Sequence, residues 1–200
     1  HLSIRRQRQM CIRDRVLVPV LYLANANNRL APNGALVQGR DVTLIAGKDL
    51  VNSGTLRASE NLSATAGTDL INGGLIEAGN RLNLLAGDNV VNQSGGIIAG
   101  RDVTVRALAG DVINERSITT FQSNPGSTTQ RLDYADNAGR IEARNDLNVG
   151  AGRDINNIGG VLSSGGDTTL IAARDVNLVS AQEHDKLTRC LLYTSPSPRD

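Results

Sequence analysis

The amino-acid sequence predicts an all-β protein, a right-handed parallel β-helix (a solenoid) of about six coils of roughly 20 residues each. Segments that begin with glycine and are similar to one another recur about every 20 residues. Within each segment apolar residues alternate with polar ones, which is the period of a β-strand, and no window keeps the spacing of a helix over about three turns. One coil buries its apolar side chains only by stacking on its neighbours, so the segments are expected to form an array.

Both ends of the 200-residue chain differ from the repeats. Residues 5–14 and 190–200 back-translate to oligonucleotides used in transposon-based sequencing libraries, so 1–15 and 190–200 are interpreted as non-native adaptor translations. A basic arm is the rival interpretation of Arg5, Arg6 and Arg8. The native segment is therefore expected to extend from about Val16 to about Arg189.

The composition of this native segment excludes several classes of function. Cys11 and Cys190 lie in the ends, which leaves no cysteine for a disulfide, a zinc site or a thiol nucleophile. Its 15 basic and 18 acidic residues give a net charge of −3, against +1 for the whole chain, so no nucleic-acid partner is indicated. The apolar run VLVPVLYLA at 16–24 is too short to cross a membrane and contains Pro19, so no membrane insertion is expected.

The repeats divide the native segment into successive coils. An irregular leading segment, 16–33, is followed by four coils at 34–114, which begin at Gly34, Gly54, Gly74 and Gly95. After an interruption at 115–138, two more coils at 139–180 begin at Gly139 and Gly160, and 181–189 is a short exit segment. Turns that contain glycine divide each coil into three short strands.

Apolar residues at fixed places in the coil predict its inward face. The third position holds Leu36, Leu56, Ile76, Ile97, Ile141 and Leu162, and the thirteenth holds Ala46, Ala66, Ala86, Ala107, Ala151 and Ala172. The ninth and eleventh positions are apolar in nearly every coil, so positions 9, 11 and 13 share one side of a strand. Leucine-rich repeats have a similar period, but they need leucine at every second or third position where this sequence has Gly, Lys and Asp.

One column of equivalent positions is polar. It holds Asn52, Asn72, Asn92, Asn114 and Asn157, and Leu178 closes the series. Asparagine amides that lie one coil above another are able to donate to and accept from each other, which predicts a ladder along the axis. The alternative is that asparagine simply tolerates the turn geometry beside glycine. Both interpretations are structural.

The interruption at 115–138 is predicted to be a hairpin that leaves the stack between the fourth and fifth coils. ITTFQ at 118–122 and TTQRLDY at 128–134 are β-prone runs, and SNPGS between them is a turn signal. Function often lies on such excursions from a rigid scaffold, so Phe121 and Tyr134 are candidates for contact with a partner. An irregular loop that covers the edge of a coil is the alternative.

Acidic residues recur at the turns and raise the alternatives of an enzyme or a calcium site. They precede the second strand of a coil or the third: Asp41, Asp102, Asp146 and Asp167, then Asp49, Asp69, Asp111, Asp154 and Asp175. A column of carboxylates is able to bind calcium. Aspartate also caps turns, and Arg40, Lys48, Arg101 and Arg153 lie adjacent to neutralise it, which is the favoured interpretation. No catalytic residue, cofactor or metal site is therefore predicted, and His184 is interpreted as a solvated side chain.

The repeat resembles that of the filamentous haemagglutinin family, and GGLIEAGNRLNLLAGDNVVN carries the pattern most completely. The resemblance covers about 34–114 and 139–178, and the leading segment and the insert are similar to haemagglutinin-like exoproteins and contact-dependent growth-inhibition proteins. It implies a non-enzymatic protein secreted to the surface of a Gram-negative bacterium by two-partner secretion.

This resemblance sets the functional expectation. The chain is expected to be a structural segment of a filament that acts in adhesion or presents a distal receptor-binding or toxin module. Its expected partners are a receptor or glycan on a host or neighbouring cell, and an outer-membrane two-partner-secretion transporter that recognises a domain outside this segment. The alternatives are a carbohydrate-acting β-helix enzyme, either a lyase or a hydrolase, and a self-associating biofilm matrix protein.

Overall fold

The computed structural model describes residues 34–123, 128–182 and 186–189. The chain divides into two compact units, and the described residues all belong to the second, Gly34–Asp200. Every regular element among them is a β-strand, and parallel strands stack into a β-solenoid of about 6 turns. The predicted all-β parallel β-helix is confirmed. Cys11, His184 and Cys190, together with both predicted adaptor segments, lie outside the described residues.

Each coil supplies the same three strand positions. The first coil contributes β1 (Leu36–Ala46) and β2 (Leu50–Asn52), and the second contributes β3 (Thr55–Ala66) and β4 (Leu70–Asn72). The third contributes β5 (Leu75–Ala78), β6 (Arg81–Ala86) and β7 (Val90–Asn92), and the fourth β8 (Ile97–Gly100), β9 (Asp102–Ala107) and the start of β10 (Val112–Ser123). The fifth contributes β12 (Arg140–Ala143), β13 (Leu147–Ala151) and β14 (Ile155–Ile158), and the sixth β15 (Val161–Ser164), β16 (Thr168–Ala172) and β17 (Val176–Val179).

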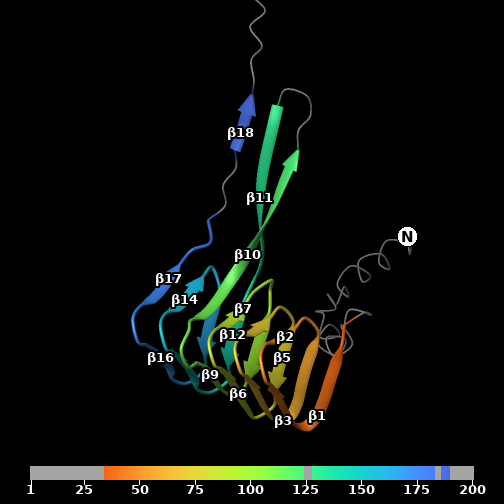
Figure 1. Ribbon diagram of the computed structural model, residues 1–200, viewed down its shortest axis with the longest axis vertical. Coiled ribbons are helices and arrows are strands. Elements are labelled where there is room, and N and C mark those ends of the chain that lie inside the picture. The colour runs from red at the N-terminus through yellow and green to blue at the C-terminus, as the bar shows by residue number, and fades with distance from the viewer. Residues whose placement is uncertain (1–33, 124–127, 183–185, 190–200) are drawn as a thin grey trace, which may run out of the picture. The chain divides into compact units, whose positions relative to one another are not determined.

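Equivalent strands of successive coils pair in parallel and form three stacks, which Figure 1 shows as adjacent rows of arrows. The first stack contains β5, β8, β12 and β15, and the second contains β6, β9, β13 and β16. The two stacks join in the first two coils. There β1 and β3 continue without a break from the first stack into the second, so β3 pairs with both β5 and β6. The third stack contains β2, β4, β7, β10, β14 and β17.

The inward column of the first stack differs by one residue from the prediction in two coils. Ile98, not Ile97, pairs with Ile76 and Ile141, and its side chain is completely buried. The turn before it takes an additional residue, since Ser94 and Gly95 both adopt positive φ, at 54° and 73°. The fourth coil therefore begins at Gly96, which precedes Ile97 as Gly74 precedes Leu75.

The first coil shows the opposite deviation. Val37, not Leu36, pairs with Leu56, because the register of β1 shifts between Gly39 and Asp41, where β1 has one residue fewer than β3. The first deviation lies in a turn and the second is a register shift within β1, and the strands stay paired on either side of each. The predicted positions Leu36 and Ile97 are therefore wrong, and the inward column is Val37, Leu56, Ile76, Ile98, Ile141 and Leu162.

The core is one continuous aliphatic column through the four inner coils. Its completely buried side chains include Leu82, Val103 and Leu147, which pair in register with one another along the second stack. The repeated alanine is buried in the inner coils and half-buried in the first and last. In the sixth coil Leu178 is 64% exposed, because no described strand stacks beyond it.

The insert forms the predicted hairpin. β10 starts in the third stack and continues as the first strand of the hairpin, where it pairs antiparallel with β11 (Thr128–Ala138). The outer edge of β11 pairs antiparallel with β18 (Lys186–Arg189), so that Thr128 lies opposite Arg189. A strand in the exit segment was not predicted, because KLTR has no alternation that distinguishes it from a loop.

Candidate functional site

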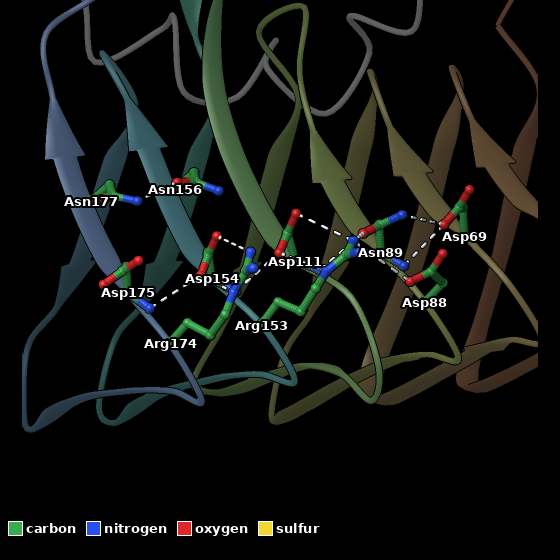
Figure 2. A network of polar contacts seen from close by, with 10 residues as sticks. All are labelled: Asp69, Asp88, Asn89, Asp111, Arg153, Asp154, Asn156, Arg174, Asp175 and Asn177. Carbon is green, nitrogen blue, oxygen red and sulfur yellow. Dashed lines mark hydrogen bonds and ion pairs between the residues drawn. The ribbon is translucent and has the colours of Figure 1, made fainter.

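A column of acidic and amide side chains runs along the turn before the third stack (Figure 2). Each side-chain oxygen accepts a hydrogen bond from the backbone N–H of the equivalent residue one coil later. The bonds run from Asp69 N to Asp49 Oδ1 at 3.2 Å, Asn89 N to Asp69 Oδ1 at 2.9 Å, Asp111 N to Asn89 Oδ1 at 2.9 Å, Asp154 N to Asp111 Oδ1 at 3.0 Å and Asp175 N to Asp154 Oδ1 at 3.1 Å. Each coil therefore supplies the acceptor that caps the next.

Two carboxylates of this column, those of Asp111 and Asp154, pair with arginines. Arg174 binds Asp154 through Nη2 at 2.7 Å and Nε at 3.1 Å, and Arg153 Nε lies 3.3 Å from Asp111 Oδ1. The hydrogen bond from Arg174 lowers the pKa of Asp154, and the same contact raises the pKa of Arg174. These carboxylates are thus occupied by backbone and guanidinium donors, an arrangement that organises turns.

The turn before the second stack carries a similar column. Asp41 Oδ1 accepts from Asn61 N at 3.3 Å, and Asp146 Oδ1 accepts from Asp167 N at 3.0 Å. The side chain of Asn145 donates to Asp102 at 2.7 Å, and this bond lowers the pKa of Asp102. Within the described ranges, no three or more His, Cys, Asp or Glu side chains are grouped as a metal ion requires.

Of the four basic residues predicted to neutralise the turns, Arg153 contacts Asp111 and Arg101 contacts Asp102, at 3.3 Å and 3.7 Å. Arg40 and Lys48 make no ion pair with another described residue. Arg174 was not predicted to take part. Its partner Asp154 lies 20 residues earlier, in the preceding coil, so adjacency in the chain does not reveal the pair.

The five asparagines of the polar column form one continuous chain of hydrogen bonds inside the solenoid. The amide nitrogen of each donates to the side-chain oxygen of the next: Asn52 to Asn72, Asn72 to Asn92 and Asn92 to Asn114 at 2.8 Å each, and Asn114 to Asn157 at 2.7 Å. The same nitrogens also donate to backbone carbonyl oxygens, such as Asn92 Nδ2 to Gly96 O at 2.9 Å. No buried side-chain N or O atom in the described ranges lacks a hydrogen-bond partner.

The hairpin presents one of the two candidate partner-binding aromatics. Tyr134 lies opposite Thr119 and is 58% exposed. The backbone of Phe121 pairs with Leu132, while its side chain lies outside the described residues. Cross-strand hydrogen bonds from Thr119 to Asp136 at 2.8 Å and from Thr120 to Asp133 at 2.6 Å hold the two strands in register.

The outer face of the second stack carries a groove that the sequence analysis did not predict. It has a volume of about 500 Å³ and crosses β9, β13 and β16. Its lining includes Thr104, Arg106, Leu108, Asn148, Gly150 and Ile171.

No helix within the described ranges is long and apolar enough to cross a membrane.

Two protein-family models match the part of the chain that contains these coils. A family model described as "Haemagglutinin repeat" matches residues 21–93 and 67–120, which together make up half of the chain. A second model, described as "Hemagglutinin repeat", matches residues 120–189. A search of the curated proteins and a search of the solved structures each found no match.

Proposed function

The chain belongs to the haemagglutinin-repeat family and is a segment of a filamentous haemagglutinin-like adhesin, and from this membership we propose that it is a secreted surface filament segment that adheres to other cells. The same filament is proposed to hold a distal receptor-binding or toxin module away from the producing cell. Families of this kind are typical of exoproteins exported by two-partner secretion. Export would be directed by a domain outside this segment and an outer-membrane transporter.

The observation that carries the proposal is that each coil bonds to the next in the same way. Three strand stacks, the asparagine column and the capping column all repeat from coil to coil. An array of this type extends by adding equivalent coils, because each coil needs only its neighbours. Such a scaffold is suited to spanning distance and to displaying surface features at regular intervals.

The charge and hydrogen-bond arrangement supports a structural and adhesive role over a hydrolytic one. A glycoside hydrolase needs two carboxyl groups that flank one bond, with at least one free to exchange a proton. Asp111 and Asp154 instead accept backbone and guanidinium hydrogen bonds. The hairpin and the outer face of the solenoid are the features available for contact with a partner.

The adhesive role is tested with beads that carry the full chain. Beads are incubated with cultured epithelial cells and with Gram-negative bacterial cells, and the bound beads are counted. Beads that carry the Ile76→Asp variant, whose buried column is disrupted, are the control. We expect several-fold more binding by the native chain. Equal counts for native and Ile76→Asp beads on each kind of cell would contradict an adhesive role for this segment.

A further inference from the structure

The outer face of the second stack carries a column of short polar side chains that is in register over all six coils. The column consists of Thr43, Ser63, Asn83, Thr104, Asn148 and Thr169. None of these side chains hydrogen bonds to another described residue, in contrast to the asparagine column inside the solenoid. The column therefore presents hydroxyl and amide groups outward at the strand spacing of about 4.8 Å.

The neighbouring outward column is interrupted at one position. It holds Ile45, Thr65, Leu85, Arg106, Gly150 and Ile171. Gly150 lacks a side chain, and the space between Arg106 and Ile171 forms part of the groove of about 500 Å³. The backbone of Gly150 does not need glycine, since its φ is not positive and a Cβ there would lie 3.7 Å from Arg106 Cγ and Nε. Glycine inside a strand marks a bulge, a bend, or a place where a ligand or another backbone approaches closely, and β13 pairs with both neighbours across Gly150 without a register shift.

Arg106 gives this groove its charge. It is exposed and is the one charged residue in the lining. Unlike Arg153 and Arg174, it makes no ion pair or hydrogen bond with another described residue. A free guanidinium presents a planar fork of donors that matches a carboxylate in two parallel hydrogen bonds. A second groove on the same face contains Asp41 as well as Arg81, so it lacks this single positive charge.

We propose that this groove binds an acidic polysaccharide, and that Arg106 hydrogen bonds to the carboxylate of a uronate residue. Asn148, Thr104 and Thr169 bind ring hydroxyls, and Leu108 and Ile171 contact the apolar face of a sugar ring. The inference depends on the proposed adhesive function, for which it names the ligand class. The strands β9 and β13 are paired on both edges, so a peptide cannot add a strand along this face. A polymer rich in hydroxyl groups matches the column of short side chains instead.

The test uses Gly150→Leu, which fills the groove, and Thr65→Leu, the same residue at the equivalent position outside it. Leu85 already occupies this column, so leucine is compatible with the strand. Binding of the full chain to polygalacturonate, its fully methyl-esterified form and polyglutamate is measured by calorimetry. We expect polygalacturonate to bind, esterification to weaken it, and Gly150→Leu and Arg106→Leu each to weaken it about tenfold or more. Thr65→Leu should bind as the native chain does, with all variants retaining the native Tm.

Several results would overturn the proposal. They are no binding of polygalacturonate, equal binding by Gly150→Leu and the native chain, or equally tight binding of polyglutamate. The bead assay separates this failure from failure of the adhesive function. Native beads that adhere without binding polygalacturonate would overturn the groove assignment alone. Binding of polygalacturonate by a chain whose beads do not adhere would overturn the cellular role and keep the groove.

Discussion

Single side chains stabilise the solenoid in two ways, through aliphatic contact and through amide hydrogen bonds. Ile76 is completely buried between Leu56 and Ile98 and contributes by removal of apolar surface from water. Asn92 is equally buried, yet it is compatible with the core because its donors and acceptor are all paired along the column. Substitutions at the two kinds of position are therefore expected to destabilise the fold for different reasons.

Ile76→Asp tests the aliphatic column. The aspartate carboxylate would have no partner between Leu56 and Ile98, and we expect a loss of about 3–5 kcal/mol in the free energy of unfolding. The control is Glu77→Gln, whose side chain points outward and contacts Arg57 at 3.1 Å, and it should cost under about 1 kcal/mol. Urea unfolding measures both. Comparable losses would mean that the inward face is misassigned.

Asn92→Ala tests the amide column. The substitution removes the buried hydrogen bonds that Asn92 makes with Asn72, Asn114 and Gly96, so we expect a loss of about 2–4 kcal/mol. Asn83→Ala removes the same group from the exposed outer column and should cost under about 0.5 kcal/mol. Stability is again measured by urea unfolding. An equal loss at both positions would show that the hydrogen bonds of the asparagine column do not stabilise the fold.

Asp154 is expected to make stability depend on acidic pH. Hydrogen bonds from Arg174 lower the pKa of its carboxyl below the ordinary value of 3.8, so the folded chain binds that proton less readily than the unfolded chain. Its contribution is complete above the ordinary pKa and is lost as pH falls through the lowered folded-state pKa. Asp154→Asn should therefore make the fall in stability below about pH 4 less steep. Thermal unfolding at several pH values measures this. An unchanged pH profile would contradict this assignment.

At the scale of secondary-structure elements, the hairpin is separable from the coils. β10 belongs to the third stack only as far as Glu115, and from Arg116 onward it pairs with β11. Ser117 Oγ still accepts from Ser94 N at 2.8 Å, which fixes the base of the hairpin to the turn before the fourth coil. Arg116 Nε also donates to Gly159 O at 3.3 Å. The hairpin therefore has its own pairing, and its contacts with the coils lie at its base.

Replacement of 118–135 by a short Gly-Ser turn tests this separation. Because Arg116 already lies opposite Ala138 and loop shortening costs little, we expect the β-rich circular dichroism spectrum and cooperative unfolding to persist. Cell adhesion of beads that carry this variant would also show whether the hairpin contributes to binding. Loss of the β signal would mean that the hairpin is part of the solenoid core.

At the scale of the whole molecule, the coils are nearly equivalent units in one array. Deletion of 54–73 removes one full coil and brings Asn52 next to Asn92, so the columns are preserved. We expect this variant to fold, with lower stability, because its outer coils can restack. Deletion of 54–63 shifts the register by half a coil and should abolish cooperative unfolding. Folding of the shorter deletion would mean that the coil register described above is wrong.

The sequence by itself determined the fold class, the coil period and the two residue columns that define the interior. The alanines from Ala66 to Ala151 and the asparagines from Asn52 to Asn157 recur at matching places, and alternation around them defines strands. These features are local in each coil and repeat along the chain. Stacking only brings together positions that the repeat had already made equivalent.

Only the tertiary structure decided where the register slips and what each polar side chain binds. Ile98 replaces Ile97 in the column because a turn with two positive φ values takes an additional residue, and a count along the chain does not reveal it. Asp154 caps Asp175 in the following coil, not its own turn, since the coil spacing brings that N–H within 3.1 Å. The groove at Gly150 exists only because stacking places side chains of the fourth and sixth coils on either side of this glycine of the fifth coil.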